Sequence, residues 1–250
     1  MQLRDRNLII LPERFKDYVM MADHQKPQTY REAMQTGEAA QWKAAMDDEI
    51  KSLIQMDTWE LVDLPPGKKL VDCRWVFKVK IKANGEFDKF KARVVAKGFS
   101  QIPGIDYKEV FSPVVRYDTI RTLLSAAASE GLELMQFDVK TAFLNGELDE
   151  EIFMKQPDGF NNGTKRVCKL KRSIYGLKQA PRCRNIKFTN SIKSQGLIPS
   201  QADPCLYHSQ NKKEKLFLAI YVDDGILCGS NLQEMKKFMN NLKEAFTITE

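Results

Sequence analysis

Two adjacent aspartates, Asp223 and Asp224, interrupt a run of strand-forming apolar residues in the segment LAIYVDDGIL. An uncompensated carboxylate inside a buried strand costs several kcal/mol, so the pair has no place in the middle of such a strand. Successive side chains of a strand point to opposite faces, so both carboxylates address one site only if the backbone turns between them. The segment therefore predicts a tight strand–turn–strand hairpin that carries carboxylates to the rim of a sheet.

A third aspartate, Asp138, follows the apolar run LELMQF and precedes VKTAFL. If these two strands lie side by side, Asp138 comes close to Asp223. Carboxylates on neighbouring strands suit a hard divalent cation that carries phosphate, as in phosphoryl or nucleotidyl transfer. An aspartate pair alone is common in turns, because aspartate favours them. Asp138 is thus the observation that favours a metal site over an ordinary turn.

The net charge of +6 is concentrated in two segments. Residues 161–202 contain no Asp or Glu, and residues 68–97 are rich in Lys and Arg; the acidic stretch NGELDEEI lies between them. Such segments are either solvated faces or a cationic groove for a phosphate backbone, and charge patterning alone favours the solvated faces. Two separate basic segments keep the nucleic-acid hypothesis open.

The five cysteines show no pairing rhythm, which favours a reducing compartment. Cys205 and His208 have a ligand-like spacing, but no second pair completes a zinc site. The N-terminal MQLRDRNLIILPERF has too short an apolar run for a signal peptide, and nothing approaches a membrane span. We expect a soluble, intracellular protein without a membrane partner.

Periodicity predicts a mixture of helices and strands after an N-terminal tail. A helix of two to three turns should end near Met56, with Trp42, Ala45, Met46, Ile50, Leu53 and Ile54 on one stripe. A β-hairpin with cations on both arms should turn at ANGEF, and an Ala-rich helix should stop at Gly131. Beyond it we expect a buried strand reaching Asp138, a strand and turn passing into a helix over 167–197, the hairpin at 216–230, an amphipathic helix and the start of a further strand.

Three segments, QFDVKTAFLNG, SIYGLKQAPR and AIYVDD, closely resemble in this order the reverse transcriptase domain of Ty1/copia-type long-terminal-repeat retrotransposons. Flanking segments such as RWVFKVK and KARVVAKGFSQIPGIDYKEVFSPVVR extend the likeness over roughly residues 29–250. The resemblance implies an α+β right-hand polymerase, with fingers and a palm whose antiparallel sheet has helices packed behind it, and an absent or truncated thumb. It divides the chain into a linker following integrase (1–28), N-terminal helices and fingers (29–135), and a palm with an interleaved fingers segment that is truncated at its C-terminus (136–250).

The resemblance also implies the site. Asp138, Asp223 and Asp224 match the family's catalytic, metal-binding aspartates, which hold two Mg²⁺ ions, or Mn²⁺ in their place. The substrates are then an RNA template, a DNA primer and dNTPs. Phe143 matches the aromatic that excludes a ribose 2′-hydroxyl, although a core Phe beside Leu144 is the plainer interpretation. The other residues matched to nucleotide binding are Arg93, Lys80 or Lys78, Tyr175, Gly176, Lys178, Gln179 and Pro181.

Two departures from the family pattern qualify this interpretation. Arg184 occupies the position of a usual Trp, and a buried Arg there could cost a few kcal/mol. The remaining Pol segments, with protease and integrase upstream and RNase H downstream, are not in the sequence, although the intact element needs them and assembles into cytoplasmic virus-like particles. The alternative is a catalytically silent remnant that at most binds nucleic acid. A metal-dependent phosphatase or nuclease is weaker, because YGLKQAP and KARVVAKG would have no role in it.

Overall fold

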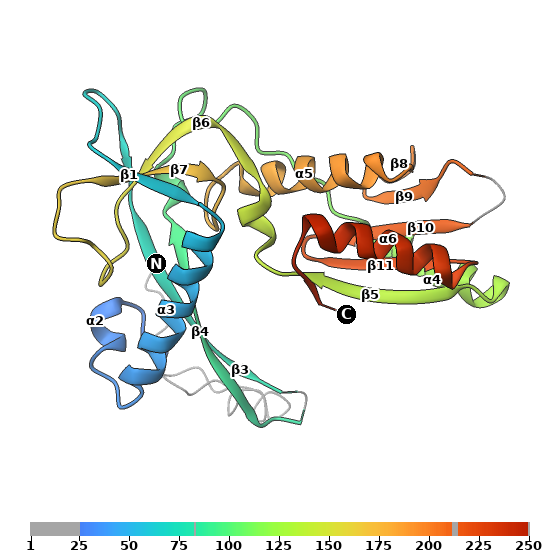
Figure 1. The fold of residues 1–250 in the computed structure, drawn as a ribbon, viewed down its shortest axis with the longest axis horizontal. Helices are drawn as coiled ribbons and strands as arrows, with labels where there is room; N and C mark the ends of the chain where they lie inside the picture. Colours follow the sequence, from blue (N-terminus) through green and yellow to red (C-terminus); the bar gives the residue numbers. More distant parts are fainter. Residues whose placement is uncertain (1–25, 83, 212–214, 250) are drawn as a thin grey trace, which may run out of the picture.

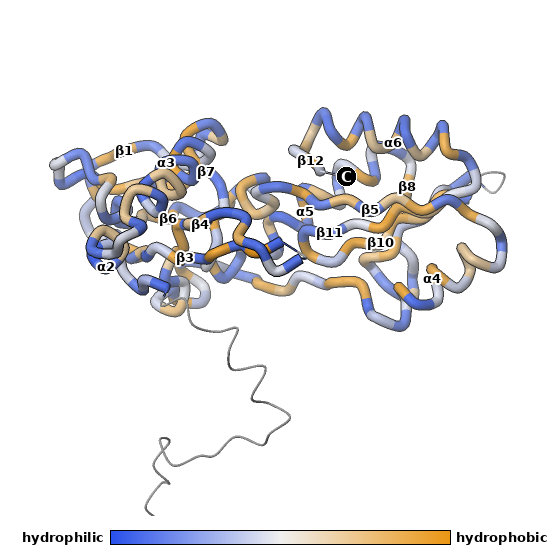
Figure 2. Tube along the Cα trace, turned by 90° about the horizontal axis from the view of Figure 1, so that it is seen from below, coloured by the Kyte–Doolittle hydropathy of each residue, from blue (hydrophilic) through white to orange (hydrophobic). Residues whose placement is uncertain are grey.

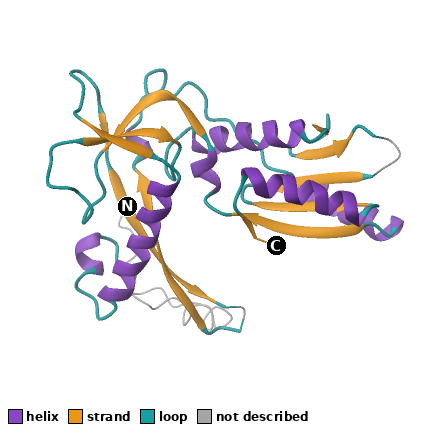
Figure 3. Ribbon diagram, viewed as in Figure 1, coloured by secondary structure: helices purple, strands orange, loops and turns teal. Residues whose placement is uncertain are grey.

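A computed structural model describes residues 26–82, 84–211 and 215–249. The chain forms two bodies joined by α5 and by irregular segments (Figure 1). Both bodies contain helices together with largely antiparallel strands (Figure 3), which confirms the predicted α+β class. Most of the predicted tail, residues 1–25, lies outside the described residues.

The first body, here called the hairpin body, contains these elements: α2 (Tyr30–Ala33), α3 (Ala39–Gln55), β1 (Trp59–Val62), β2 (Leu70–Val71), β3 (Cys73–Ile81), β4 (Phe87–Ala96), β6 (Glu147–Met154) and β7 (Val167–Arg172). Strands β3 and β4 form the predicted antiparallel hairpin, and the other four form a sheet of order β1-β7-β6-β2. Alternation along β3 puts Trp75 and Phe77 on the face toward α3 and leaves the cations on the other face. Trp42 of α3 packs edge-on against Phe77 and Phe90, with centroid distances of 5.2 and 4.4 Å.

Helix α3 differs from its prediction in length and in one face position. It has 17 residues, nearly five turns rather than two to three, because polar residues on its outer face continue the helix back to Ala39. Trp42, Met46 and Leu53 are buried as expected. Ile54 is 66% exposed, because it lies one residue, or about 100°, past the buried Leu53.

The second body, here called the six-strand body, is built on an antiparallel sheet of order β12-β5-β11-β10-β9-β8. Its strands are β5 (Glu133–Val139), β8 (Leu197–Pro199), β9 (Leu206–Ser209), β10 (Leu216–Tyr221), β11 (Asp224–Gly229) and β12 (Ile248–Thr249). Its helices are α4 (Tyr117–Glu130), α5 (Ala180–Ser194) and α6 (Leu232–Ala245). Gly131 ends α4 in the left-handed conformation, as predicted.

Helices cover both faces of this sheet. α5 and α6 pack with Phe137, Leu218 and Leu227 on one face. α4 packs on the other face, over Ala219 and Cys228, and Figure 2 shows α4 and α6 on opposite sides. The cluster under α4 includes residues of β10 and β11 but none of β5, so the expected buried strand before Asp138 is only half buried. Along β5, Phe137 is enclosed while Leu134 is 47% exposed.

The two bodies meet where the end of β4 lies beside the loop before α5. Ala96 N–H donates to the carbonyl of Tyr175 at 2.8 Å, and the short helix η3 (Gly98–Ser100) follows. A second connection, η4 (Ala142–Asn145), leads from β5 to β6. The sequence-based boundary at 135/136 falls within β5, and α4, which precedes it, packs against the six-stranded sheet.

Candidate active site

Strand register brings the three aspartates to one end of the six-stranded sheet. Asp224, the first residue of β11, pairs with Asp138 of β5. The Tyr221 to Asp224 pair closes a two-residue turn, Val222–Asp223, which confirms the predicted tight hairpin. Val139 N–H donates to the Asp223 carbonyl at 2.8 Å, so Asp223 also lies beside β5.

The backbone is strained beside two of these carboxylates. Val222, directly before Asp223, has φ +53°, and Thr141, three residues after Asp138, has φ +50°. A β-branched residue is a genuine outlier in this left-handed region. Such strain persists only where the surrounding contacts enforce it, and it gathers at functional sites.

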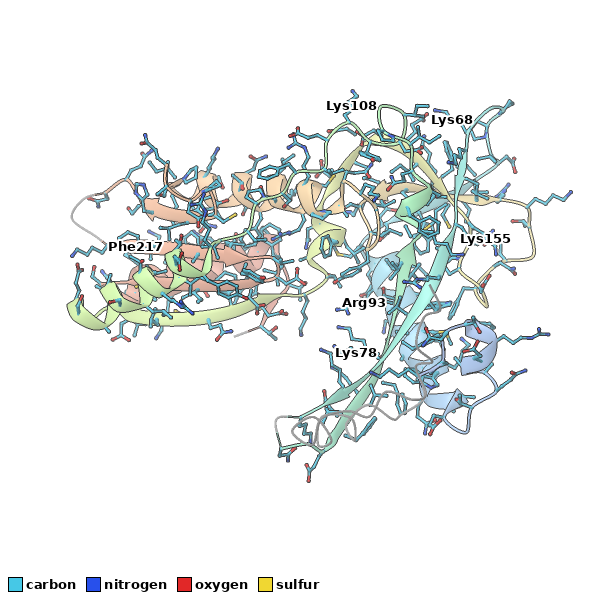
Figure 4. All side chains as sticks on the ribbon, turned by 180° about the vertical axis from the view of Figure 1, so that it is seen from behind. Lys68, Lys78, Arg93, Lys108, Lys155 and Phe217 are labelled. Carbon is cyan, nitrogen blue, oxygen red and sulfur yellow. The ribbon has the colours of Figure 1, made fainter. Side chains whose placement is uncertain are left out.

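A cavity of about 470 Å³ separates the turn from the β3–β4 hairpin. Asp138 and Asp223 line it on one side, and cationic residues of the hairpin line it on the other. The lining cations are Lys80, Lys89, Lys91, Arg93 and Lys140. Figure 4 shows Arg93 and Lys78 projecting from the hairpin toward the six-strand body.

Asp224 lines a different, smaller cavity of about 260 Å³ on the α4 side of the sheet. Tyr117 and Tyr221 line the same cavity, and their rings lie 6.0 Å apart between centroids. In the described part of the chain, no three His, Cys, Asp or Glu side chains form a group ready to hold a metal ion. The sheet therefore brings the trio to one rim without closing it into a complete ligand set.

The surroundings of Asp223 nevertheless fit a cation. Its Oδ1 is buried without a hydrogen-bond partner. Burial raises the pKa of Asp223. The neighbouring carboxylates of Asp138 and Asp224 add to this rise, whereas the nearby Arg184 lowers the pKa. A carboxylate oxygen that is buried, unpaired and repelled by other carboxylates is a ligand that Mg²⁺ would satisfy. The donors near Asp223 are carboxylate oxygens, the type of ligand that this ion prefers.

Among the residues matched to nucleotide binding, Tyr175 lies at the centre of one group. Its ring meets Phe143 edge-on, with centroids 4.8 Å apart, and the Arg93 guanidinium lies 4.8 Å above it. Burial raises the pKa of the Tyr175 hydroxyl. Arg93, Tyr175 and Lys80 line the 470 Å³ cavity, whereas Phe143 is half-buried behind Tyr175.

The rest of the YGLKQAP segment does not line this cavity. Gln179 is buried and committed to protein partners: it donates to the Asp106 carbonyl at 2.9 Å and accepts from Gln101 at 3.0 Å. The exposed Lys178 donates its N–H to Gln101 at 2.8 Å, and the carbonyl of Pro181 accepts from Ser112 at 3.0 Å.

The backbone of Gly176 approaches the protein's own chain closely. A Cβ atom there would lie 2.1 Å from the Ala96 carbonyl oxygen.

Some cavity residues were missed by sequence reasoning. Lys91 faces Lys78, and Lys89 faces Lys80, across the hairpin. The Asn–Gly turn already implied this register, so the pairs were available from the sequence. Like charges directly opposite are destabilising, and a bound anion would relieve them. Glu49 of α3, whose carboxylate accepts from Val94 N–H at 3.2 Å, gave no signal, because it lies on an ordinary polar helix face.

Comparisons with known proteins agree with the motifs. Residues 56–250 match the family model described as "Reverse transcriptase (RNA-dependent DNA polymerase)". The retrovirus-related Pol polyprotein from transposon TNT 1-94 of Nicotiana tabacum is 43% identical over 94% of this chain and 18% of its own length. The Pol polyprotein from transposon RE1 of Arabidopsis thaliana is 37% identical over 93% of this chain and 16% of its own length. The transposon Ty1-DR5 Gag-Pol polyprotein of Saccharomyces cerevisiae is 29% identical over 81% of this chain and 11% of its own length. The chain thus spans less than a fifth of the length of these relatives.

Among solved structures, an apo telomerase from Candida tropicalis truncated from the C-terminal domain is similar with a TM-score of 0.43 and 12% identity. The match covers 83% of this chain and 53% of that one. Within the described residues, no helix combines the length and apolarity needed to cross a membrane.

Proposed function

Because the chain belongs to the reverse transcriptase (RNA-dependent DNA polymerase) family, we propose that it adds dNTPs to a DNA primer along an RNA template, with Asp138, Asp223 and Asp224 as the metal-binding carboxylates. The observation that carries the proposal is the pairing of Asp138 with Asp224 beside a turn whose Asp223 keeps an unpaired, buried oxygen. Neither a structural turn nor a solvated surface needs that arrangement.

Two divalent cations held by the trio would lower the pKa of the primer 3′-hydroxyl and offset the charge of the leaving pyrophosphate. The chain's own part is to hold the carboxylates and to surround the triphosphate with positive charge. The β3–β4 hairpin and Asp138 face each other across the same cavity, so one triphosphate can contact both walls. No protein nucleophile is required.

The nucleotide contacts follow from the cavity walls. Arg93 presents a planar fork for phosphate oxygens while its other face lies on Tyr175. Lys80 and Lys89, opposite each other on the hairpin, add point charges. Phe143 supports Tyr175 and is the residue we assign to excluding a ribose 2′-hydroxyl. Gln179, with its partners inside the protein, acts by holding the segment in place rather than by touching the nucleotide.

As in an intact element, we propose that other Pol segments, integrase and RNase H among them, accompany this domain, and that it works in cytoplasmic virus-like particles. Its acid-free basic stretch, residues 161–202, would contact the template–primer backbone without sequence preference.

Primer extension tests the proposal. The chain, alone and joined to the residues that follow the matching region in the tobacco relative, is given an RNA template, a DNA primer, dNTPs and Mg²⁺. Asp223→Asn should lower extension by about 10³-fold or more, because an amide is a poor ligand for the ion. Asp63→Asn, whose side chain is 91% exposed, is the matched control and should leave extension unchanged.

Extension that survives Asp223→Asn would refute the assigned roles. Salt-dependent RNA binding without extension, even in the joined protein, would instead select the silent remnant.

A further inference from the structure

Arg184 of α5 is an arginine where the resembling family usually has Trp, and the structure buries it. Its side chain is 3% exposed and lies beneath the Val222–Asp223 turn. A guanidinium is expensive to bury unless it is hydrogen-bonded, so a partner is required. The penalty expected from the sequence is therefore real, but the structure offsets part of it.

The partner is the strained turn. Nη1 of Arg184 donates to the carbonyl oxygen of Val222, which lies 38 residues further along the chain. Nε of Arg184 and Oδ1 of Asp223 are both buried without a hydrogen-bond partner. The cation and the carboxylate are near enough for each to affect the charge of the other.

This contact reaches the residue whose backbone most needs support. A Val at φ +53° is strained, because its Cβ crowds the neighbouring carbonyl. A charged donor on the Val222 carbonyl favours the one orientation of that peptide in which the oxygen faces α5. The next residue is Asp223, whose carbonyl accepts from Val139 of β5.

We propose that Arg184 is a positioning residue: it holds the Val222 peptide in its left-handed turn and thereby sets Asp223 against Asp138. Only the consequence for metal binding depends on the proposed function. The rival is simple packing, in which Arg184 fills the space of the family's Trp and the hydrogen bond is incidental.

Hydrogen exchange at the Val139 amide tests the proposal without any catalysis, since that amide is bonded to the Asp223 carbonyl. Arg184→Met keeps an unbranched apolar stem but removes the donor, and it should speed exchange there by about tenfold, the loss of one charged hydrogen bond. Arg182→Met is the matched control: Arg182 is two residues away on the same helix and pairs with Glu109 instead. It should leave exchange at Val139 within about twofold of the parent.

Val222→Gly separates positioning from packing, because glycine adopts positive φ without strain. If Arg184 acts by holding φ, Arg184→Met in the Val222→Gly background should change exchange by less than about threefold. If Arg184 only fills space, the two backgrounds lose protection equally, and that result overturns the proposal. If Arg184→Met fails to fold, Arg184→Lys takes its place, because lysine keeps the charge and a donor. Exchange of the Val139 amide in Arg184→Lys that is as fast as in an Asp223→Gly chain would then also refute the positioning role.

The outcomes remain separable from those of the polymerase proposal. If Arg184→Met speeds exchange at Val139 but Asp223→Asn leaves primer extension unchanged, the positioning role stands and the metal assignment is rejected. If Arg184→Met leaves exchange unchanged but Asp223→Asn abolishes extension, the metal assignment stands and the positioning role is rejected.

Discussion

Gly176 joins the two bodies at a contact that leaves no room for a side chain. Its φ is +92°, and a Cβ atom there would lie 2.1 Å from the Ala96 carbonyl oxygen and 2.7 Å from Val95 Cγ1. The adjacent Tyr175 carbonyl accepts the Ala96 N–H at 2.8 Å. Gly176→Ala therefore strains its own backbone and pushes against β4.

The expected loss has two parts. Placing alanine at positive φ costs about 1 kcal/mol. Separating Cβ from the Ala96 oxygen means moving backbone atoms by about 1 Å, which costs about 2 kcal/mol through overpacking and the weakened Ala96–Tyr175 hydrogen bond. We expect a total of about 3 kcal/mol, equal to a fall in Tm of about 9 °C for a chain of this size.

Gly67→Ala is the matched control. Gly67 also has positive φ, +77°, but no atom lies within 4 Å of the place that a Cβ would occupy, so only the backbone part of about 1 kcal/mol should appear. Urea unfolding followed by tryptophan fluorescence reads both variants. All three tryptophans lie in the hairpin body, on whose edge Gly176 packs: Trp42, Trp59 and Trp75.

Equal losses of stability in Gly176→Ala and Gly67→Ala would refute the close approach as the constraint on Gly176. Such losses would mean that β4 and the loop before α5 move apart at little cost to make room for a Cβ. The positive φ alone would then account for the loss of stability in Gly176→Ala. A larger loss for Gly176→Ala, with an unchanged denaturant dependence, would confirm the close approach as the constraint.

Three further results are expected. Asp203→Ala should cost about 3 kcal/mol, because its buried carboxylate accepts from Arg116 N, Thr119 Oγ1 and Cys205 N at 2.9, 2.7 and 3.0 Å. Burial opposes these bonds but does not outweigh them, so the pKa of Asp203 is lowered. The stabilisation by Asp203 is therefore present above the pKa of the unfolded state and is lost as pH falls through the pKa of the folded state. Urea titrations at a series of acid pH values would detect this loss. Asp223→Asn should raise stability at pH 7 in EDTA, since burial and neighbouring carboxylates raise the pKa of Asp223. The gain should shrink as pH falls through that folded pKa, and a gain that stays constant with pH would contradict the assignment. Phe143→Ala should increase incorporation of ribonucleotides relative to deoxynucleotides by about tenfold or more in primer extension, and an unchanged ratio would reduce Phe143 to a support for Tyr175.

Much of the local structure was predictable because its determinants are close in sequence. The Asn–Gly turn and the alternation of Trp75 and Phe77 with lysines specified the hairpin and its register. Gly131 ends α4 because glycine readily adopts the left-handed conformation, which is a property of that residue alone. The length of α3 was underestimated because a polar outer face carries no periodic signal, although it continues a helix readily.

The candidate site was predictable in its parts but not in its connections. Asp138, Asp223 and Asp224 stood out because carboxylates are costly among strand-forming residues, whatever surrounds them. Gln179 and Lys178 lie in a motif that resembles a nucleotide-binding segment, yet their bonds to Gln101 depend on a loop about 78 residues away, which no local pattern encodes.

The sequence by itself determined the turns, the helices and the identity of the three carboxylates, because backbone preference and burial cost act within a few residues. Only the tertiary structure decided that Asp138 and Asp223 share a cavity with the hairpin cations while Asp224 lines a separate one. It also decided that Arg184, an unfavourable substitution when considered alone, lies under Val222. Both outcomes depend on how two bodies with separate cores and a distant helix pack together, and such contacts follow from the whole arrangement rather than from any one segment.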